Sequence, residues 1–405
     1  MNIGVFLTIS SNSVSLYRYA ATLISALCRD KNDNRYFLFH TYADYPDFIK
    51  MQSNWRAIHL KDETIYYGLL GKAEKYIDLG LHICFKRNLL PFASIPFRRR
   101  IRKMIREIGI DLMIYPWTDY MSFELGVPYI ITVHDLQHKL HPEFKEVSEN
   151  GVWRVREYAA KNGCKFAKAI LVDSDVGKKH IMNYYNIDPG RIVVLPFVPP
   201  KITSYSCVTS KLSLNIIKNK FNLPDKFIFY PASFQPHKNH RSLILAVNYI
   251  YKRYGIKIPC VFTGPKASAY ETVAELIDSL KMNDQIFYLG FVEHQEITLL
   301  YKLASMMVMP TFFGPTNLPV VEAWSAGCPV ITSDIEGIRE QVKHAGIIVD
   351  PNNWKKLAKA IYDVYTNKQL RDKLIQSGYN ELKSYNFDRY TEILLETVRS
   401  TASKL

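Results

Sequence analysis

Several classes of protein are excluded by what the sequence lacks. Six cysteines occur in 405 residues and no CxxC pair is present, so neither a disulfide framework nor a thiolate metal site is expected, and a reducing compartment fits. No uncharged apolar run reaches the ~20 residues that a membrane-spanning helix needs. The nearest candidate, residues 79–97, is interrupted by Lys86 and Arg87. The cysteines are Cys28, Cys84, Cys164, Cys207, Cys260 and Cys328.

The amino-terminal residues also lack the features of a secretory signal. Residues 1–7 run directly into an apolar strand, with no basic segment followed by a small-residue cleavage site. We therefore expect no signal peptide and a cytoplasmic location.

The composition is that of a folded protein with an excess of positive charge. Hydrophobic residues make up 48%, aromatic residues 13% and charged residues 22%, which is enough apolar material for sizeable cores and excludes a largely disordered chain. The 52 basic and 38 acidic residues give a net charge of +14. Nucleic acid, an anionic membrane surface and phosphate-bearing substrates all suit such a charge.

Short apolar runs alternate with longer segments of helical period in both halves of the chain. The runs are continuous rather than alternating, as expected for strands that helices cover on both faces. Helices are predicted between them, for example over 16–29, 241–254 and 353–366. This alternation predicts two doubly wound α/β domains. The predicted strands are 3–9, 36–40, 56–60, 111–117, 129–135, 169–174, 192–197, 227–233, 259–264, 286–292, 306–312, 329–334 and 346–350.

A proline-rich stop and a polar stretch mark the boundary between the two domains. Residues 196–200 read Pro-Phe-Val-Pro-Pro, and a Ser/Thr/Lys-rich stretch follows. We expect an N-terminal domain over 1–200, a linker over 201–221 and a C-terminal domain over 222–380. A final helix over 381–405 is expected to pack back on the N-terminal domain. Two such domains would face each other across a cleft at the carboxyl ends of their sheets, where ligands of these folds bind.

The segment 309–324, MPTFFGPTNLPVVEAW, is the most informative one. It predicts a strand, a small-residue turn, and a helix that begins at Leu318 or Pro319 and is capped by Thr316 or Asn317. The free backbone N–H groups and positive dipole end of such a helix can bind a diphosphate. Glu322, one turn further, is placed to accept hydrogen bonds from ribose hydroxyls. For the isolated segment, a capped helix with a solvated glutamate is an equally good interpretation.

A second segment, 229–240, has the same organisation. A buried strand enters the loop Ser-Phe-Gln-Pro-His-Lys-Asn before the next helix. Lys238 is a candidate ligand of a phosphate, although an isolated lysine is more often a solvated surface residue. His237 and His240 lack a third nearby ligand, so no metal site is expected.

Together these two segments resemble the donor-binding half of retaining GT-B glycosyltransferases of family 4. The matches, in order and spacing, are Lys238-Asn239, Leu318-Pro319, Glu322-Ala323 and Gly327-Cys328-Pro329-Val330. The resemblance extends loosely to the first half through Val133-His134-Asp135-Leu136. It implies a GT-B fold and a donor site formed by Ser233, Lys238, Gly314, Thr316, Asn317, Leu318 and Glu322.

The sequence departs from the family pattern at several positions. The first glutamate of the family's E-x7-E motif, which ordinarily meets hydroxyls of the transferred sugar, falls on Gly314, and the usual arginine before the lysine falls on Ser233. Backbone donors from Gly314 to Leu318 could take over part of that glutamate's role. The amino-terminal loop around Ser13 lacks the usual paired glycines.

In the first half, the resemblance implies that His134 contacts the transferred sugar. Asp135 could orient the imidazole or cap the next helix. The alternative for His134 is a hydrogen bond between a strand-end histidine and neighbouring backbone. Ser13 and Asp135 are the candidate acceptor-side residues, and His134, Lys238 and Glu322 are the candidate catalytic residues.

The implied reaction breaks the bond between an anomeric carbon and a nucleoside diphosphate. Lys238 and the helix start near Leu318 would stabilise the leaving diphosphate, so no metal and no cofactor are expected. No carboxylate pair suited to glycoside hydrolysis is evident.

The stretch from Lys72 to Arg106 is strongly basic, with ten basic residues against two acidic ones and interleaved apolar residues. It predicts binding to an anionic membrane surface, near a polyprenyl-diphosphate-linked acceptor. An ordinary solvated helix face is the alternative. Nucleic-acid binding is disfavoured because no nucleic-acid module accompanies the charge.

The sequence is therefore interpreted as a peripheral, metal-independent, retaining glycosyltransferase at the inner face of the membrane. It would transfer a hexose from a nucleotide sugar, with GDP-mannose as one candidate donor, to build a cell-surface glycan such as lipopolysaccharide. Two alternatives stay open: a nucleotide-sugar epimerase of similar architecture, and a catalytically silent scaffold protein at the membrane.

Overall fold

Two parallel sheets organise the chain. The computed structural model describes all residues except 10–13, 42–44, 61–94 and 200–209. Its contacts define two units. The first comprises Met1–Pro142, Val147–Pro196 and Asp388–Leu405, and the second comprises Glu143–Glu146 and Phe197–Phe387.

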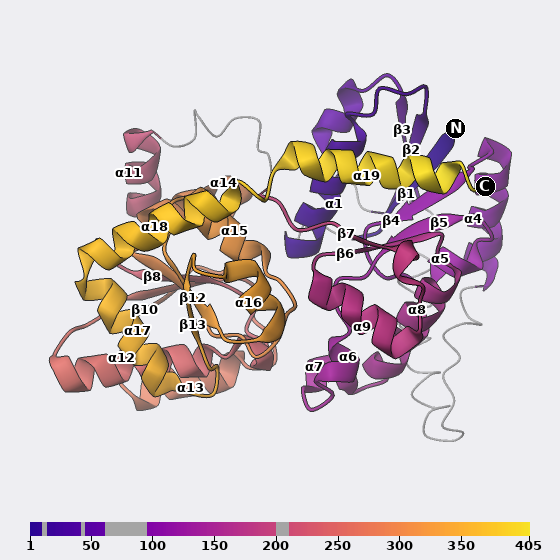
Figure 1. The fold of residues 1–405 in the computed structure, drawn as a ribbon. Helices are drawn as coiled ribbons and strands as arrows, with labels where there is room; N and C mark the ends of the chain where they lie inside the picture. Colours follow the sequence, from indigo (N-terminus) through magenta and orange to yellow (C-terminus); the bar gives the residue numbers. More distant parts are fainter. Residues whose placement is uncertain (10–13, 42–44, 61–94, 200–209) are drawn as a thin grey trace. The chain divides into compact units, whose positions relative to one another are not determined.

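The first unit is built on a seven-stranded parallel sheet of order β3-β2-β1-β4-β5-β6-β7 (Figure 1). Its strands are β1 (Asn2–Leu7), β2 (Arg35–His40), β3 (Trp55–His59), β4 (Leu112–Tyr115), β5 (Tyr129–Thr132), β6 (Ala169–Val172) and β7 (Ile192–Val194). Its helices are α1 (Val14–Leu27), η1 (Asp47–Met51), α4 (Ile95–Ile108), α5 (Met121–Glu124), α6 (Gln137–Leu140), α8 (Val152–Phe166), α9 (Asp175–Tyr185), η2 (Pro189–Arg191) and most of α19 (Phe387–Ala402).

The second unit is built on a six-stranded parallel sheet of order β10-β9-β8-β11-β12-β13. Its strands are β8 (Ile228–Pro231), β9 (Cys260–Thr263), β10 (Ile286–Tyr288), β11 (Met306–Met309), β12 (Val330–Ser333) and β13 (Ile347–Val349). Its helices are α11 (Lys211–Lys220), η3 (Pro236–Lys238), α12 (His240–Tyr254), α13 (Tyr270–Ser279), α14 (His294–Leu303), α15 (Leu318–Ser325), α16 (Glu336–Val342), α17 (Trp354–Thr366) and α18 (Lys368–Leu382). Helix α7 (Lys145–Ser148) contains the boundary between the units at Glu146.

These sheets confirm the predicted α/β architecture, and each predicted strand is present. Most of the predicted strands extend past the observed carboxyl ends, in several cases because apolar residues such as Val133 follow the strand. One difference concerns the predicted linker, where Lys211–Lys220 form α11 and Ile217 is buried in the second core. The side chain of Ser210 caps this helix by accepting a hydrogen bond from the Ser213 backbone N–H.

Asp388–Leu405, at the end of the chain, are part of the first unit. The Arg29 guanidinium lies 2.5 Å from the Asp388 carboxylate there. In the part of the chain that the structure describes, no helix is both long and apolar enough to cross a bilayer.

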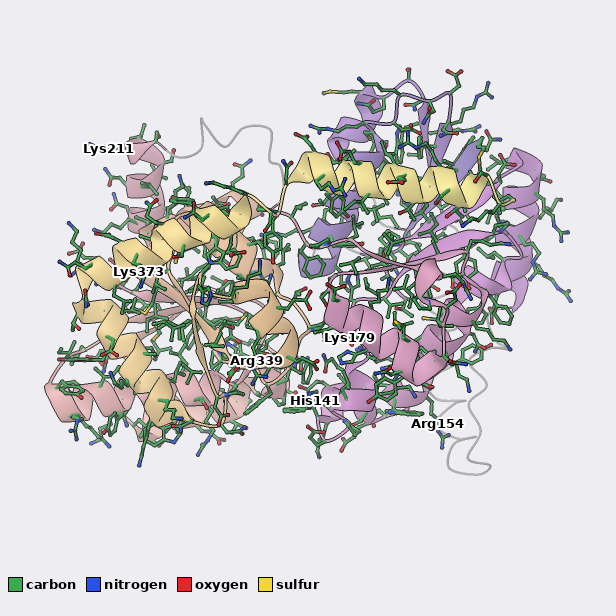
Figure 2. The ribbon with its side chains drawn as sticks, viewed as in Figure 1. His141, Arg154, Lys179, Lys211, Arg339 and Lys373 are labelled. Carbon is green, nitrogen blue, oxygen red and sulfur yellow. The ribbon has the colours of Figure 1, made fainter. Side chains whose placement is uncertain are left out.

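Basic side chains are spread over the surface of each unit (Figure 2). In the second unit, Lys211 on α11, Arg339 on α16 and Lys373 on α18 are exposed and point outward. Arg154 and Lys179 are exposed on helices of the first unit. The excess positive charge of the sequence is therefore not confined to one element.

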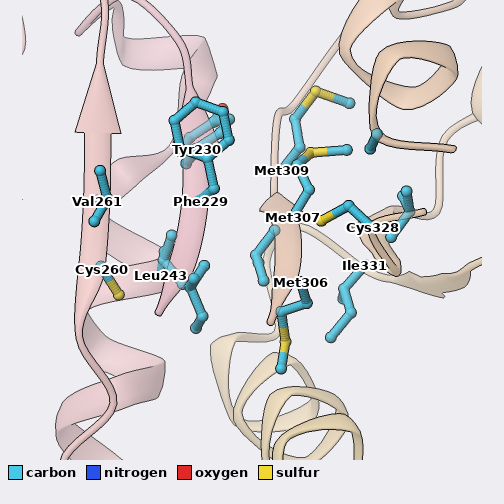
Figure 3. Packing of buried hydrophobic residues seen from close by; sticks show 14 of the residues in the cluster. Phe229, Tyr230, Leu243, Cys260, Val261, Met306, Met307, Met309, Cys328 and Ile331 are labelled. Atoms are coloured by element: carbon cyan, nitrogen blue, oxygen red, sulfur yellow. The ribbon is translucent and has the colours of Figure 1, made fainter. Parts of the chain in front are cut away.

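The core of the second unit lies where β8, β11 and β12 run side by side. Met306, Met307 and Met309 of β11 are buried, and Phe229 and Ile331 lie on the neighbouring strands (Figure 3). Methionine suits this position because its unbranched side chain fills irregular gaps.

One titratable residue, His240, is enclosed in this core at the first position of α12. Its side chain is 2% exposed, its ring stacks on Phe234 at 4.2 Å, and Tyr230 and Phe262 pack against it at 4.7 and 5.2 Å. Neither ring nitrogen has a hydrogen-bond partner among the described residues. Burial, assisted by the charge of Lys238, lowers the pKa of His240 to about 3.

We expect His240 to make the protein less stable in acid. An unfolded histidine has a pKa of about 6.5, so between roughly pH 6.5 and 3 the unfolded state binds a proton that the folded state does not. From pH 7 to 5, this group should lower the free energy of unfolding by about 2 kcal/mol, and His240→Phe should remove that part of the pH dependence. Urea unfolding at each pH measures it.

The matched control is His344→Phe, because His344 is exposed in the same unit. The free energy of unfolding of His344→Phe should change with pH as it does in the unmodified protein. A His240→Phe variant with unchanged pH dependence would contradict the assignment of a buried, neutral imidazole.

Candidate functional site

The two segments singled out from the sequence follow neighbouring strands. Strands β8 and β11 pair directly, with Phe229 opposite Met307, and the sheet order reverses between them. The loops 232–239 and 310–317 therefore emerge side by side at the carboxyl edge of the sheet. In open α/β sheets this reversal is where ligands bind.

Hydrogen bonds join these two loops into one structure. The His237 carbonyl accepts from the Phe312 backbone N–H at 2.8 Å and lies 3.1 Å from the Thr311 hydroxyl. The Asn239 amide donates to the Pro310 carbonyl at 2.9 Å. The position of either loop therefore depends on the other.

Lys238 lies between these joining residues. Its carbonyl accepts a hydrogen bond of 2.7 Å from the Tyr230 hydroxyl, and burial holds the pKa of Tyr230 well above its ordinary value, so this hydroxyl stays a donor. The Lys238 side chain is partly exposed. An anchored backbone with a partly exposed lysine side chain suits the binding of an anion.

Helix α15 begins at Leu318, as predicted, with Asn317 at the cap position and Pro319 in its first turn. The Asn317 side chain makes no capping hydrogen bond. Instead, Gln341 on α16 binds the Asn317 backbone on both sides: its Oε1 accepts from the N–H, and its Nε2 donates to the carbonyl, each at 3.0 Å. These two hydrogen bonds fix the start of α15. The first N–H groups of a helix have no partner within the helix itself.

The turn before α15 depends on two glycines. Gly314 has a φ of +134°, which side chains rarely allow. On α16, a Cβ at Gly337 would lie 1.6 Å from the Pro315 carbonyl oxygen, so only glycine permits this approach. Thr316 lies in the same turn and is partly buried.

Glu322 lies in the second turn of α15 and is 8% exposed. The Tyr301 hydroxyl, itself buried on α14, donates to Glu322 Oε2 at 3.2 Å. A carboxylate with one oxygen oriented by a buried hydroxyl is a preorganised acceptor, which a pair of vicinal hydroxyls suits.

A short segment that follows the first-unit helix α6 also contacts these loops. Glu146 Oε1 accepts hydrogen bonds from the His237 backbone N–H at 3.0 Å and from Nδ1 at 2.8 Å. The ring of Phe144 packs against Phe312 at 5.5 Å and Phe313 at 5.2 Å. Residues Glu143–Glu146 belong to the second unit for this reason.

Seven predicted site residues belong to the second unit, on or beside the joined loops: Ser233, Lys238, Gly314, Thr316, Asn317, Leu318 and Glu322. The other predicted site residues that the structure describes, His134 and Asp135, belong to the first unit. There His134 Nε2 lies 2.9 Å from the Pro116 carbonyl, the ring of Tyr19 packs edge-on against it, and burial lowers the pKa of His134. Asp135 forms an ion pair with Arg156. Ser13 lies outside the described residues.

Sequence reasoning did not identify Asn239, Gln341, Gly337 and Glu146 as site residues. Asn239 is part of the Lys238-Asn239 match, and its position in the loop after a strand could have indicated a role in the site. Gln341 follows Asn317 by 24 residues and belongs to none of the matched motifs, and Glu146 precedes His237 by 91 residues.

The histidines near Lys238 occupy unlike surroundings. His237 contacts Glu146, whereas His240 lies among aromatic rings in the core. Within the described ranges, no group of three or more His, Cys, Asp or Glu side chains is arranged to hold a metal ion.

Comparison with known families covers most of the chain. Residues 214–381 match the family described as Glycosyl transferases group 1, and residues 64–197 match Glycosyltransferase Family 4. The chain belongs to the GT-B glycosyltransferases of family 4, group 1.

Relatives with similar sequences include two bacterial mannosyltransferases. The O-antigen chain mannosyltransferase B of Escherichia coli is 24% identical over 263 residues, 65% of this chain and 68% of that protein. The O-antigen chain mannosyltransferase RfbU of Salmonella typhimurium is 27% identical over 264 residues, 65% and 67% of the two chains.

Solved structures share the fold. Sucrose-phosphate synthase from Thermosynechococcus elongatus superposes with a TM-score of 0.74 at 16% identity, covering 100% of both chains. Anabaena HepE in complex with UDP and glucose gives a TM-score of 0.73 at 15% identity, covering 99% of this chain and 100% of that one.

Replacing Gln341 should destabilise the start of α15, by an amount that depends on the new side chain. Gln341→Ala leaves the buried Asn317 N–H without a partner, at about 1–3 kcal/mol. It leaves the Asn317 carbonyl with only the hydrogen bond of 3.2 Å from the Val320 backbone N–H. Gln341→Glu can still accept from the N–H but cannot donate to the carbonyl, so its loss should be smaller. Urea unfolding, followed by the fluorescence of the buried Trp324 in α15, measures both.

The control is Gln376→Ala on α18, where the side chain is exposed and the change should stay within about 0.5 kcal/mol. Equal stability of Gln341→Ala and Gln376→Ala would show that the start of α15 does not depend on Gln341.

Proposed function

We propose that this glycosyltransferase transfers a hexose from a nucleoside diphosphate sugar to a glycan or polyprenyl-diphosphate-linked acceptor during synthesis of a cell-surface polysaccharide. The joined loops at the reversal of the second sheet are the observation that carries the proposal. The names of the mannosyltransferase relatives support a role in glycan synthesis, and the HepE complexes with UDP support a nucleotide donor.

The diphosphate would bind between Lys238 and the start of α15. The ammonium group supplies a full positive charge, and the helix start supplies N–H donors with a positive dipole end. Because hydrogen bonds join the two loops, both groups would be held in place before the substrate arrives. Preorganised donors of this kind stabilise a leaving group most effectively.

Glu322 would accept hydrogen bonds from the ribose hydroxyls. Its hydrogen bond with Tyr301 leaves further acceptor capacity on the carboxylate, which has about four lone-pair sites. This contact would orient the nucleoside and, with it, the diphosphate and the sugar.

We propose a retaining reaction without a metal ion. The bond between the anomeric carbon and the diphosphate oxygen breaks, and a bond from the acceptor hydroxyl forms on the same face of the sugar. The hydroxyl proton passes to the departing diphosphate oxygen, so the leaving group acts as the base. Lys238 and the helix start would offset the charge that accumulates on the diphosphate.

His134 would contact the transferred sugar as a neutral imidazole. Its Nε2 faces the Pro116 carbonyl, which can only accept, so Nε2 carries the proton and Nδ1 is left as an acceptor. Mannose is the hexose that the relatives favour, and GDP would then be the nucleotide.

Nucleotide binding in the absence of metal tests the donor site. Thermal unfolding is measured with GDP, UDP and dTDP, each with EDTA and with magnesium. A nucleotide at ~100 times its dissociation constant should add about 2.7 kcal/mol of stability in EDTA. Lys238→Ala and Glu322→Gln should each abolish most of that gain.

Lys252→Ala, an exposed lysine on α12, is the control and should keep the full gain. If no nucleotide stabilises the unmodified protein, the donor site is wrong and a silent scaffold becomes the better interpretation. Free monosaccharide or an isomerised nucleotide sugar formed without acceptor would favour an epimerase instead.

We also propose that the protein attaches to an anionic membrane surface through the basic stretch from Lys72 to Arg106. Residues 72–94 of that stretch lie outside the described residues. The remainder forms α4, whose Ile101 and Ile105 are buried while Arg99, Lys103 and Arg106 are exposed. A helix with one buried apolar face and one basic exposed face suits a surface of anionic headgroups.

Reversing the charge on α4 should release the protein from vesicles. In flotation with phosphatidylglycerol-containing vesicles, Arg99→Glu with Arg106→Glu should weaken binding, because each basic residue near the surface contributes about 1 kcal/mol. Lys211→Glu with Lys373→Glu changes the net charge equally on exposed positions of the second unit, so it separates a local effect from overall charge. Equal losses in both double variants would refute a specific role of α4.

A further inference from the structure

The family's first carboxylate is missing from this chain at Gly314, and the backbone there disfavours any side chain. The φ of +134° at Gly314 is one that side chains rarely adopt, and a Cβ would lie 3.3 Å from the Asn317 amide atoms. A glutamate at this position would require a different turn. Any carboxylate that meets the transferred sugar must therefore come from elsewhere in the chain.

Glu146 brings a carboxylate to the same loops. Its Oε1 accepts two hydrogen bonds from His237, one from the backbone N–H at 3.0 Å and one from Nδ1 at 2.8 Å. The carbonyl of His237 in turn accepts from the Phe312 N–H, in the loop that leads into Gly314. His237 therefore links Glu146 to Phe312, two residues before Gly314.

Aromatic contacts also connect the segment of Glu146 with the residue before Gly314. The His237 ring stacks on Phe313 at 4.1 Å, with the ring planes within 10° of parallel. Phe144, two residues before Glu146, packs edge-on against Phe313 at 5.2 Å. Phe313 directly precedes Gly314, so the carboxylate and the turn share one packed cluster.

The second oxygen of this carboxylate has no partner. Glu146 Oε2 is buried, and among the described residues no donor lies within hydrogen-bonding distance of it, although the side chain is 11% exposed as a whole. A buried acceptor without a donor is costly, by about 1–3 kcal/mol and more for a charged group. Such an atom in a native site calls for a donor that binds there.

We propose, on the basis of the proposed function, that Glu146 Oε2 accepts a hydrogen bond from a hydroxyl of the transferred sugar. Glu146 thus takes the place of the carboxylate that the family pattern has at Gly314. His237 holds Oε1 and leaves Oε2 for the substrate, so one carboxylate both fixes the loop before Lys238 and selects the sugar.

Binding measurements separate sugar recognition from a structural role. The probes are GDP and UDP and their hexose conjugates, GDP-mannose and UDP-glucose, measured by calorimetry with the full chain. Glu146→Gln keeps the shape and an oxygen for His237, but its amide nitrogen cannot accept at the second position. For the pair that binds, the dissociation constant of the sugar conjugate should rise about 10- to 100-fold, and that of the nucleotide alone should change less than about twofold.

Conjugates that lack one sugar hydroxyl identify the contact. For one such deoxy conjugate the effect of Glu146→Gln should vanish, because the hydroxyl and the carboxylate act as a coupled pair. Glu146→Asp, which keeps the charge, should restore part of the affinity for the intact conjugate. Glu143→Gln, an exposed carboxylate in the same segment, is the control and should leave both affinities unchanged.

The outcomes are distinct. Equal weakening of nucleotide and conjugate in Glu146→Gln would assign Glu146 a structural role only, and unchanged binding of both would exclude any role. Absence of nucleotide binding by the unmodified protein would overturn the proposed function itself. If Glu146→Gln does not fold, Glu146→Asp together with the deoxy conjugates still provides the test.

Discussion

The candidate site depends on the hydrogen bonds that the Asn239 side chain makes. Its amide donates to the carbonyls of Pro310 and Pro351, both at 2.9 Å, and its oxygen lies 3.3 Å from the Ser242 N–H at the start of α12. The backbone has a φ of 55°, a left-handed conformation that asparagine tolerates well. One side chain therefore joins the segments that follow three strands, β8, β11 and β13, and Lys238 directly precedes it.

Two of the buried polar groups without hydrogen-bond partners lie in or against the loop 310–317. Asn317 Nδ2 is a buried donor and Glu146 Oε2 is a buried acceptor, and within the described residues neither has a hydrogen-bond partner. Both sit in or against the loop 310–317, whereas most polar groups of the folded core are satisfied. One is a donor and the other an acceptor, so the proposed substrate could supply a partner for each.

Lys238 and the exposed basic residues on the helices differ in their surroundings. The backbone of Lys238 is held by a hydrogen bond from the Tyr230 hydroxyl to its carbonyl. The exposed basic residues of α4 lie on a helix face, and others such as Lys211 and Lys373 lie on helices of the second unit. Surface charge of this kind is screened by salt within about 10 Å, so it affects association more than the chemistry.

The sequence by itself determined the secondary structure, the α/β class and the motif residues. Continuous apolar runs located the strands because residues buried on both faces must be apolar. It overextended β5 to residue 135, since the apolar Val133 follows Thr132, and it placed α11 in a linker. Lys238 and Glu322 could be proposed as site residues because their motifs depend on local spacing after a strand.

Only the tertiary structure decided which distant residues complete the site. Gln341 and Glu146 carry no local signal, because their roles arise from the packing of α16 and of the segment 143–146 against loops far away in the sequence. The same holds for Gly337, whose missing side chain matters only because the Pro315 carbonyl lies against it. Local sequence fixes what a strand–loop–helix unit can bind, whereas the contacts between such units depend on the whole fold.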